Sequence, residues 1–425
     1  MYDLIIRDAT IITSEGRLVA DIAVEDGRIA HVGASALGDA REEVQGIGRF
    51  VIPGVIDTQV RMRTPGAADG PEWARNSRSA VTGGVTTIFD LPDAGPGTTS
   101  RAALRAKLDQ AASESVCNYG LWVGASADNL ESLWEWVEAG LAIAPYARLD
   151  RTTGPLGIGL EGLSGLAAAA GERLVGVYAE DPSAFTTGSD GAEVRPPEAA
   201  AARVEQLLAL SRAHDARLHI TSLSTAAELN LLDPHRGDLP ITTAVAPPHL
   251  FLSEQLVGKL DGATHVHPPI RPELDRRGLW AAIKRGRIDV AASDHTPIDR
   301  ATNIAGQAGM PGVGLLFPML MSAVRHGRMP LERVVEMCCE APARIFGLKG
   351  KGRIEVGAHA DLVLMTEGDT ERLKGPPAWA TVDWSPFKGR DAGVAPKLVV
   401  VGGRIVAREG ALMDDLAPGQ AVSAG

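Results

Sequence analysis

The sequence has few cysteines, few aromatic residues and no excess of positive charge, and each shortage narrows the possible functions. Its 425 residues include 3 cysteines, too few for a disulfide framework. Lysine and arginine number 42 against 53 acidic residues, a formal net charge of −11 that argues against nucleic acid or an anionic membrane as partner. No apolar run is long enough to span a bilayer, and the N-terminus lacks a basic segment followed by an apolar one. We therefore expect a cytoplasmic protein.

The middle of the chain predicts a barrel. Strand-like apolar runs alternate there with helical stretches, which is typical of parallel βα units. We predict eight strands, at Val51–Thr58, Val85–Leu91, Tyr119–Gly124, Leu141–Tyr146, Leu174–Tyr178, Leu218–Ser222, Ile241–Ala246 and Ile288–Ser293. Eight is the count for a (β/α)8 TIM barrel of the α/β class, whose functional residues follow the carboxyl ends of the strands.

The two ends of the chain carry a similar pattern of short strands. Asp26-Gly27 and Gly402-Gly403 each separate two strand-like runs, which indicates tight hairpins. We predict one small β-sandwich built from both termini, with the barrel inserted between its halves. The predicted domains are residues 1–50 for the N-terminal part of the sandwich, 51–350 for the barrel and 351–425 for the C-terminal part.

The stretch from Val51 to Gly66 begins as a buried strand and then becomes polar on alternate residues. Since side chains alternate between the two faces of a strand, Asp57, Gln59, Arg61 and Arg63 are expected to share one face. A strand that is apolar at its start and polar at its end suits a barrel whose site lies at the strand ends.

These motifs resemble a known family. Pro53-Gly54-Val55-Ile56-Asp57 resembles the opening of the cyclic amidohydrolases, the group of dihydroorotases, hydantoinases and allantoinases. Other segments resemble dihydroorotase motifs, among them Val177–Asp181, His219–Thr225, Val245–Leu250, His267–Arg271 and Ser293–Ile298. The resemblance extends nearly end to end, and it implies the barrel and sandwich predicted above together with zinc-dependent hydrolysis of a cyclic amide.

The metal-binding motifs of that family are degenerate here. By resemblance, the zinc ligands would fall at Gln59, Arg61, Tyr178, Ser222 and Asp294, with a carboxylated lysine on the fourth strand. Of these positions only Asp294 matches, and no lysine lies near Ala144-Pro145. A guanidinium is never deprotonated and an amide is a poor zinc ligand. We therefore predict that the family zinc site is lost and that no cofactor is bound.

The residues that would bind the substrate differ from those of the family as well. In dihydroorotases the carboxylate is held by residues that correspond to Arg63, Asp93 and Ile298. Arg63 is retained, but Asp93 is expected to repel a carboxylate and Ile298 has no hydrogen-bond donor. His267 replaces an asparagine that contacts the substrate in the family. Dihydroorotate is therefore a poor candidate substrate.

The remaining polar residues still suggest a pocket. We predict catalytic roles for Asp294, Arg61 and Tyr178, with Asp294 as general acid or base. The substrate-binding candidates are Arg63, Asp93, His267, Gln59 and Ser222. Three alternatives stay open. In the first, Asp294 serves only as the ion-pair partner of Arg61; in the second, Tyr178 is a packed core residue; in the third, His265, His267 and Asp294 form a rebuilt metal site.

The sequence supports two functions about equally. The chain is either a non-catalytic partner of another enzyme, for example an aspartate transcarbamoylase, or a metal-independent enzyme acting on a cyclic amide or imide. The alternative is a zinc-dependent cyclic amidohydrolase with a rebuilt metal site. The resemblance also implies a homo-oligomer and a small-molecule ligand.

Overall fold

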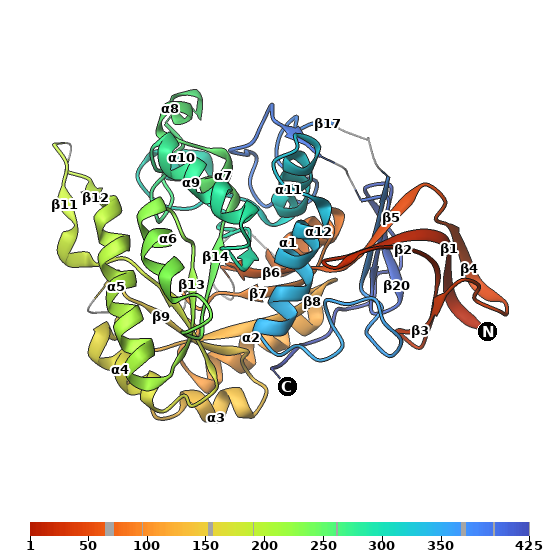
Figure 1. The fold of residues 1–425 in the computed structure, drawn as a ribbon, viewed down its shortest axis with the longest axis horizontal. Coiled ribbons are helices and arrows are strands. Elements are labelled where there is room, and N and C mark those ends of the chain that lie inside the picture. The colour runs from red at the N-terminus through yellow and green to blue at the C-terminus, as the bar shows by residue number, and fades with distance from the viewer. Residues whose placement is uncertain are drawn as a thin grey trace.

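The computed structural model describes residues 1–63, 72–95, 97–151, 156–189, 191–260, 262–366, 371–393 and 396–424. A barrel ringed by helices occupies one end of the molecule, and a separate sheet made from both ends of the chain occupies the other (Figure 1).

Eight parallel strands form the barrel, which confirms the predicted fold. They are β6 (Val55–Val60), β7 (Val85–Asp90), β8 (Asn118–Gly124), β9 (Ala144–Arg148), β10 (Leu174–Tyr178), β13 (Arg217–Thr221), β14 (Ile241–Val245) and β15 (Val290–Ala291). The barrel closes beyond β15, where the Arg61 N–H donates to the His295 carbonyl at 2.8 Å and the His295 N–H donates to the Gln59 carbonyl at 3.2 Å.

Helices surround the barrel or follow its strands (Figure 1). They are α1 (Glu72–Thr82), α2 (Arg101–Glu114), α3 (Leu133–Glu138), α4 (Gly159–Ala168), α5 (Pro197–His214), α6 (Ala226–Leu232), α7 (Pro247–Phe251), α8 (Glu254–Val257), α9 (Glu273–Lys284), α10 (Arg300–Ile304), α11 (Leu316–Arg325), α12 (Leu331–Val335) and α13 (Ala341–Ile345). The short turns are η1 (Pro182–Ala184), η2 (Asp233–His235), η3 (Gly258–Leu260), η4 (Val313–Leu315) and the π-helical η5 (Glu336–Glu340).

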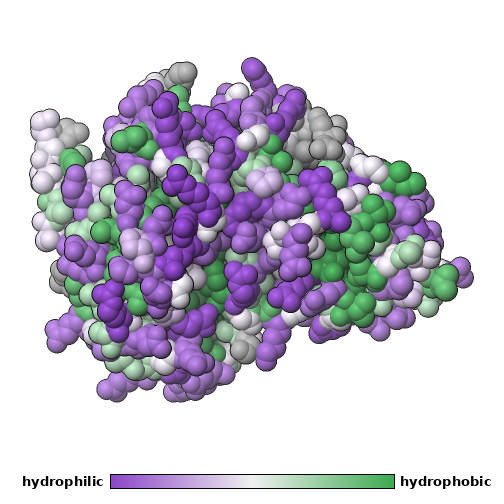
Figure 2. Space-filling model, viewed as in Figure 1, coloured by the Kyte–Doolittle hydropathy of each residue, from purple (hydrophilic) through white to green (hydrophobic). Residues whose placement is uncertain are grey.

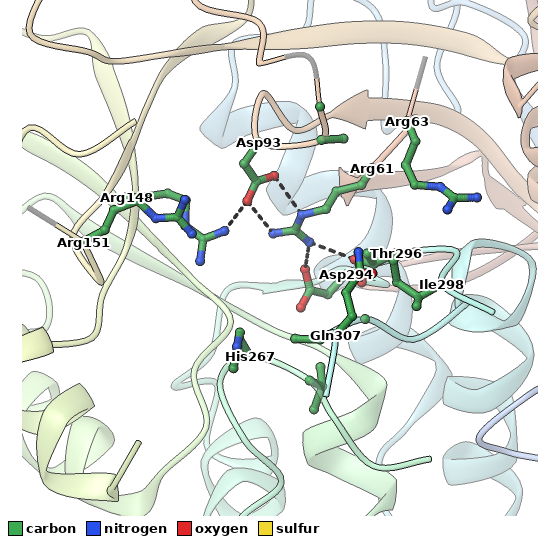
Figure 3. A pocket seen from close by; sticks show the side chains of 15 residues that line it. Arg61, Arg63, Asp93, Arg148, Arg151, His267, Asp294, Thr296, Ile298 and Gln307 are labelled. Carbon is green, nitrogen blue, oxygen red and sulfur yellow. Dashed lines mark hydrogen bonds and ion pairs between the residues drawn. The ribbon is translucent and has the colours of Figure 1, made fainter. Parts of the chain in front are cut away.

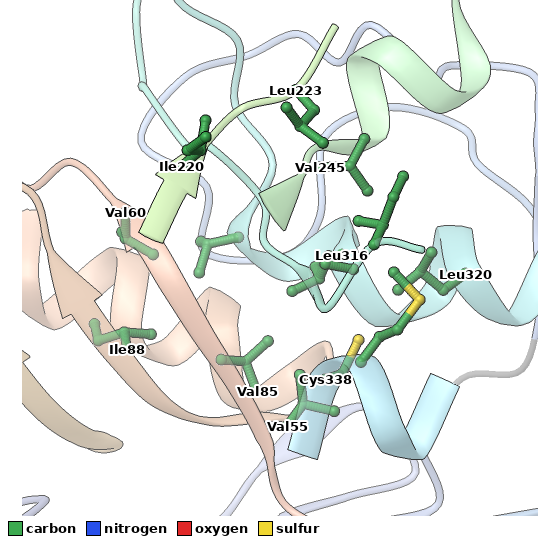
Figure 4. Packing of buried hydrophobic residues seen from close by; sticks show 14 of the residues in the cluster. Val55, Val60, Val85, Ile88, Ile220, Leu223, Val245, Leu316, Leu320 and Cys338 are labelled. Atoms are coloured by element: carbon green, nitrogen blue, oxygen red, sulfur yellow. The ribbon is translucent and has the colours of Figure 1, made fainter. Parts of the chain in front are cut away.

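The hydrophobic core lies between strands and helices. Val55 and Val85 of the barrel pack in one cluster with Leu316 and Leu320 of α11 (Figure 4). Cys338 of η5 belongs to the same cluster and is fully buried, as expected for a packed thiol.

The second sheet has nine strands and is mostly antiparallel. They are β1 (Tyr2–Thr13), β2 (Gly16–Glu25), β3 (Arg28–Gly33), β4 (Ala40–Gln45), β5 (Arg49–Pro53), β16 (Leu362–Thr366), β19 (Leu398–Val401), β20 (Arg404–Arg408) and β21 (Ala411–Leu412). Two small ribbons join β11 (Thr186–Thr187) to β12 (Glu193–Val194) and β17 (Glu371–Arg372) to β18 (Asp391–Ala392).

The two predicted hairpin turns lie against each other. Both residues of each turn have positive φ, 49° and 76° at Asp26-Gly27 and 53° and 81° at Gly402-Gly403, as tight hairpins require. A Cβ on Gly27 would lie 2.9 Å from the Gly402 carbonyl oxygen. The Ala360 N–H donates to Gly27 at 3.0 Å, and the Gly403 N–H donates to Ala360 at 2.9 Å, so both halves of the chain meet in one sheet.

The first predicted barrel strand is wrong in one respect. The run Val51–Thr58 is divided at Gly54, because β5 pairs with β1 and β16 in the second sheet while β6 pairs with β7 in the barrel. A Cβ on Gly54 would lie 2.1 Å from the Thr86 hydroxyl, so the chain can cross between the sheets there only with glycine. The predicted domain boundaries stay a prediction.

The C-terminal tail returns from the second sheet to the barrel. The Tyr119 N–H at the start of β8 donates to the Gln420 carbonyl at 3.0 Å, and the Val422 N–H donates to the Tyr119 carbonyl at 2.8 Å. A Cβ on Gly419 would lie 1.9 Å from the Cys117 carbonyl oxygen. This close backbone contact ties the end of the chain to the barrel.

The surface differs between the two parts of the molecule. Polar side chains cover most of the barrel face in Figure 2, whereas hydrophobic ones gather toward the end formed by the second sheet. Leu18 and Val19 of β2 are exposed in that sheet. Among the described residues, no helix is both long and apolar enough to cross a membrane.

Three buried histidines and the partly buried His267 predict that acid destabilises the fold. Burial lowers the pKa of His219 to about 3, of His249 to about 4, and of His267 and His295 to about 3 each. Each stays neutral in the folded state while its unfolded counterpart binds a proton as the pH falls below about 6.5. Burial also raises the pKa of Asp57 to about 7, which acts in the opposite direction.

We expect the free energy of unfolding to fall as the pH is lowered from 6.5, with each of these histidines contributing a slope of up to about 1.4 kcal/mol per pH unit. Guanidinium unfolding at pH values between 7.5 and 5.0 measures this slope. The variant His219→Gln removes one of the titrating groups, so its slope should be shallower by about one proton. A stability that does not change across this range would contradict the assignment.

Candidate functional site

A polar cavity of about 310 Å³ opens at the carboxyl ends of the barrel strands. Six charged residues line it, Arg61, Arg63, Arg148, Arg151, Asp93 and Asp294, together with uncharged residues that include His267, Thr296, Ile298 and Gln307 (Figure 3). The volume is at the lower end of the range for small-molecule sites.

The fold explains why residues far apart in sequence meet here. Arg61 directly follows β6, Asp93 follows β7, Arg148 is the last residue of β9 and Asp294 follows β15. Because the carboxyl ends of parallel strands converge at one end of a barrel, these side chains are brought to the same cavity.

Arg61 lies at the centre of the site and joins two carboxylates. Its Nε donates to Asp93 Oδ1 at 2.8 Å and its Nη2 donates to Asp93 Oδ2 at 3.1 Å, a bidentate pair. Its Nη1 donates to Asp294 Oδ1 at 2.6 Å and to the Thr296 hydroxyl at 3.2 Å. The ion pair between Arg61 and Asp294, left open as an alternative from the sequence, is present in the structure.

Asp294 keeps one oxygen available to the cavity. Its backbone has a positive φ of 52°, a conformation that few residues other than glycine adopt and that is often found at functional sites. Among the described residues, Oδ1 accepts the hydrogen bond from Arg61 and Oδ2 has no partner. The Oδ2 atom is thus free to accept a hydrogen bond from a ligand.

A second arginine neutralises Asp93 from the other side. Arg148 Nη1 donates to Asp93 Oδ2, while its Nε and Nη2 donate to Asp150 at 2.9 and 2.6 Å. Although burial alone would raise the pKa of Asp93, the charges of Arg61 and Arg148 hold it well below its usual value. The expectation that Asp93 repels a carboxylate needs correction, because its charge is balanced by two guanidinium groups.

The charged network continues behind the cavity wall. Arg195 Nη1 contacts Asp150 at 3.0 Å and Glu180 at 2.9 Å, and Arg271 contacts Glu180 at 3.1 Å. Arg148, Asp150, Arg195 and Glu180 are all buried. Buried charges persist only when they are paired and hydrogen-bonded, so these pairs fix the wall that carries Arg148.

Arg63 lines the cavity but is paired with a helix residue. Its Nε donates to Glu72 Oε1 at 2.8 Å, and its backbone N–H donates to Glu72 Oε2 at 2.7 Å. Glu72 begins α1 and is buried. Glu72 therefore already balances the charge of Arg63.

Three predicted site residues lie outside the cavity lining. The Ser222 hydroxyl donates to Gln59 Oε1 at 2.9 Å, and both residues are buried. The Tyr178 hydroxyl donates to Glu180 at 2.7 Å, and Arg148 lies 4.6 Å from the centre of its ring. The predicted catalytic role of Tyr178 and binding roles of Gln59 and Ser222 stay predictions with no contact to the cavity.

The expected alternation along β6 is also interrupted. The pairing of β6 with β7 shifts register between Asp57 and Val60. Asp57 accepts the Ser293 N–H at 2.9 Å and does not line the cavity, whereas Arg61 does. The irregularity removes the strict two-residue period on which the shared face was predicted.

The two histidines of the alternative metal site lie in different surroundings. His267 lines the cavity, while the His265 carbonyl accepts hydrogen bonds from Gly309 at 2.9 Å and Asn303 at 2.7 Å. Among the described residues, no group of three or more His, Cys, Asp and Glu side chains is arranged to hold a metal ion. The rebuilt metal site of His265, His267 and Asp294 stays a prediction.

The sequence reasoning missed the arginines on the β9 side. Arg148 and Arg151 line the cavity, and Asp150 lies between them. They follow the predicted fourth strand, so the rule that sites lie at strand ends would have indicated them. The alternating Arg-Leu-Asp-Arg pattern at 148–151 was the available signal.

Comparisons with known proteins agree with one another. The model of the amidohydrolase family matches residues 50–406. The chain is 34% identical over 421 residues to a dihydroorotase of Halobacterium salinarum, covering 95% of this chain and 96% of that one. It is 30% identical over 393 residues to an allantoinase of Bacillus velezensis, covering 86% and 85%. The L-hydantoinase of Arthrobacter aurescens has a TM-score of 0.92 at 25% identity over all of both chains.

Proposed function

The chain belongs to the amidohydrolase family, and we propose that it is a dihydroorotase-like member that has lost the family's zinc site but keeps a cavity for a small cyclic amide or imide. The observation that carries this proposal is the position of Arg61. Its guanidinium joins Asp93 and Asp294 at a place where the resemblance implies a zinc ligand.

The side chains at the other positions where the resemblance implies zinc ligands also support the loss of zinc. Zinc sites are built from imidazole, thiolate and carboxylate groups. Here the Ser222 hydroxyl donates a hydrogen bond to Gln59, and the Tyr178 hydroxyl donates a hydrogen bond to Glu180. Burial, followed by the charge of Glu180, raises the pKa of Tyr178 well above its usual value, so the phenol stays protonated. These residues do not fit a zinc ion.

The substrate side supports a ligand other than dihydroorotate. Ile298 lines the cavity and has no donor for a carboxylate. Arg63, the retained arginine, donates hydrogen bonds to Glu72 from both its side chain and its backbone N–H. A substrate carboxylate at Arg63 would therefore compete with Glu72 for the same guanidinium.

Two roles follow for such a cavity. In the first, the chain binds its ligand without turnover and acts as a partner of another enzyme, for example an aspartate transcarbamoylase. In the second, it is a metal-independent enzyme in which Asp294 Oδ2 moves a proton on a bound ring. The free Oδ2 atom supports the second role, and the tight pairing of Oδ1 with Arg61 supports the first.

Metal analysis combined with turnover tests the proposal. Protein purified without a histidine tag is analysed for zinc, manganese, iron, cobalt and nickel, and is then assayed against dihydroorotate, hydantoin and allantoin with and without added zinc. We expect no stoichiometric metal and no zinc-stimulated hydrolysis, while hydantoin binding is detected by calorimetry. The L-hydantoinase of Arthrobacter aurescens serves as the positive control for the assay.

Near-stoichiometric metal together with zinc-dependent hydrolysis would overturn the proposal. Turnover that needs no metal and disappears in Asp294→Asn, with ring binding retained, would identify the metal-independent enzyme. Absence of turnover with co-purification of a transcarbamoylase would identify the partner role.

A further inference from the structure

A second cavity lies where the β17–β18 ribbon packs against α11. It has a volume of about 240 Å³, and none of its described lining residues lines the cavity at the mouth of the barrel. Figure 1 shows α11 beside β17, and the Gly393 N–H directly after β18 donates to the Pro318 carbonyl of α11 at 2.9 Å. The polar residues that line this second cavity are Ser322, His326, Arg328, Arg372, Arg390 and Asp391.

Two turns bring Arg328 and Arg390 to this cavity. Each arginine directly follows a glycine with positive φ, 65° at Gly327 and 82° at Gly389, a conformation that favours glycine. The Gly389 N–H donates to the Leu373 carbonyl at 2.7 Å, and the Leu373 N–H donates to the Arg390 carbonyl at 2.9 Å. The backbone that carries Arg390 is therefore fixed beside the end of α11.

Neither of these two arginines has an acidic partner. Among the described residues, no hydrogen bond or ion pair joins the guanidinium of Arg328 or Arg390 to another group, although both residues are partly buried. The Arg328 guanidinium lies 5.4 Å from the centre of the Trp280 ring. Burial lowers the pKa of Arg390, and the charges of Arg276 and Arg328 lower it further. Like charges are thus held near one another.

The described carboxylates around this cavity are too few to balance its arginines. Glu273 accepts from Arg276 Nε at 2.7 Å and lies 3.1 Å from Arg277 Nε, so two arginines already share it. Asp391 lies 3.8 Å from Arg372 Nε, and both side chains are exposed. Counting the two unpaired arginines, five guanidinium groups meet two carboxylates. Positive charge therefore remains unbalanced among the described side chains.

We propose that Arg328 and Arg390 form a binding site for a phosphate dianion, carried either by inorganic phosphate or by a phosphate monoester. The planar N–H pairs of guanidinium groups match phosphate oxygens in geometry and charge. A dianion balances two neighbouring positive charges, whereas a carboxylate balances one.

The size of the cavity limits what it can hold. Its volume of about 240 Å³ lies below the usual range for sites that enclose a whole small molecule. A phosphate group fits this space, and the remainder of a monoester would extend into solvent. Because the two cavities share no described residue, this site does not depend on the proposed function.

Calorimetry on the full-length protein tests the site with three probes. Inorganic phosphate, phenyl phosphate and acetate are titrated at constant ionic strength and at pH 8, where a phosphate monoester is fully ionised. We expect phosphate to bind at least about 10-fold more tightly than acetate, as is typical of an additional charge-assisted hydrogen bond. Equal affinity for phenyl phosphate would identify a monoester as a source of the ligand, and its exclusion would identify the free ion.

Variants assign the binding to these arginines. Arg390→Gln and Arg328→Gln are each expected to weaken phosphate binding about 10- to 100-fold. Asp391→Asn tests the opposite direction, because it removes a negative charge from the cavity and should tighten binding about 2- to 5-fold. Arg101→Gln is the control, since Arg101 is 48% exposed and ion-paired with Glu135 at 3.1 Å but does not line this cavity.

Thermal unfolding gives an independent readout. A ligand that binds only the folded state stabilises it, so phosphate should raise the melting temperature of the wild type and of Arg101→Gln but not of Arg390→Gln. Sodium chloride at the same ionic strength is the control for screening. If it stabilises the protein as much as phosphate does, the effect is general screening and the site is wrong.

Three further outcomes would overturn the proposal. Phosphate binding that is equal in the wild type, Arg390→Gln and Arg328→Gln would show that these arginines do not hold the anion. Binding that is lost in Arg151→Gln and kept in Arg390→Gln would place the anion in the cavity at the mouth of the barrel. Acetate that binds as tightly as phosphate would contradict the assignment of a dianion.

Discussion

Replacing Arg61 with methionine is expected to destabilise the protein by about 3–5 kcal/mol, because it leaves buried carboxylates without their partner. Asp294 would lose its ion pair of 2.6 Å, and Asp93 would keep only Arg148. The side chains of Asp93 and Asp294 are each 4% exposed. The methionine side chain fills much of the same volume, so the loss reports charge rather than packing. Guanidinium unfolding followed by circular dichroism measures the effect.

A matched variant tests the cause of this effect. Adding Asp294→Asn to Arg61→Met removes one of the unpaired charges and should restore part of the lost stability. Arg101→Met is the control, since it breaks an exposed ion pair whose loss costs about 0–1 kcal/mol. If Arg61→Met were as stable as this control, the guanidinium would not be the counter-charge of the site.

Replacing Lys107 with methionine is expected to have a similarly large effect, about 3–5 kcal/mol. Lys107 of α2 and Asp90 of β7 form a fully buried ion pair. Asp90 also accepts the Met62 N–H at 2.7 Å, and Lys107 Nζ lies 3.5 Å from the Met62 carbonyl oxygen. The pair therefore holds the backbone between Arg61 and Arg63, and its loss should weaken ligand binding as well as stability.

The pH dependence of this variant has a defined sign. Burial already raises the pKa of Asp90, and removing Lys107 would raise it further. A carboxyl whose folded pKa lies above its unfolded value loses stability as the pH rises through the interval between them. Lys107→Met should therefore be most destabilised at neutral pH. The double variant Lys107→Met/Asp90→Asn, which keeps the acceptor for Met62, should recover much of the stability and lose this dependence.

The site also shows how a cation supplied by the chain can organise carboxylates at the mouth of a barrel. Arg61 is held in a bidentate pair with Asp93 and a single contact with Asp294. A metal at such a position exchanges with solvent, whereas the guanidinium of Arg61, directly after β6, is attached to the backbone. Chelators should accordingly leave the stability of the fold unchanged.

Local sequence was sufficient to predict the architecture. The eight strands lie where apolar runs alternate with helical stretches, and the turns at Asp26-Gly27 and Gly402-Gly403 need residues that tolerate positive φ. These features depend on periodicity and on backbone sterics, which are properties of a few neighbouring residues. The division of one apolar run at Gly54 was not predicted, because both halves are equally apolar and only the crowding by Thr86 separates them.

The sequence by itself determined the family, the barrel and the presence of Arg61 where a metal ligand was expected. Only the tertiary structure decided which charges are matched. Arg61 and Asp294 are 233 positions apart, and Arg148 and Asp93 are 55 apart, so no local pattern reveals that they pair. Whether an arginine is free to bind a ligand depends on which carboxylates the fold brings within hydrogen-bond distance. Arg63 and Arg151 cannot be told apart by residue type. In the folded protein they differ in their ion pairs, because Arg63 is paired with Glu72, whereas Arg151 shares Asp150 with two other arginines.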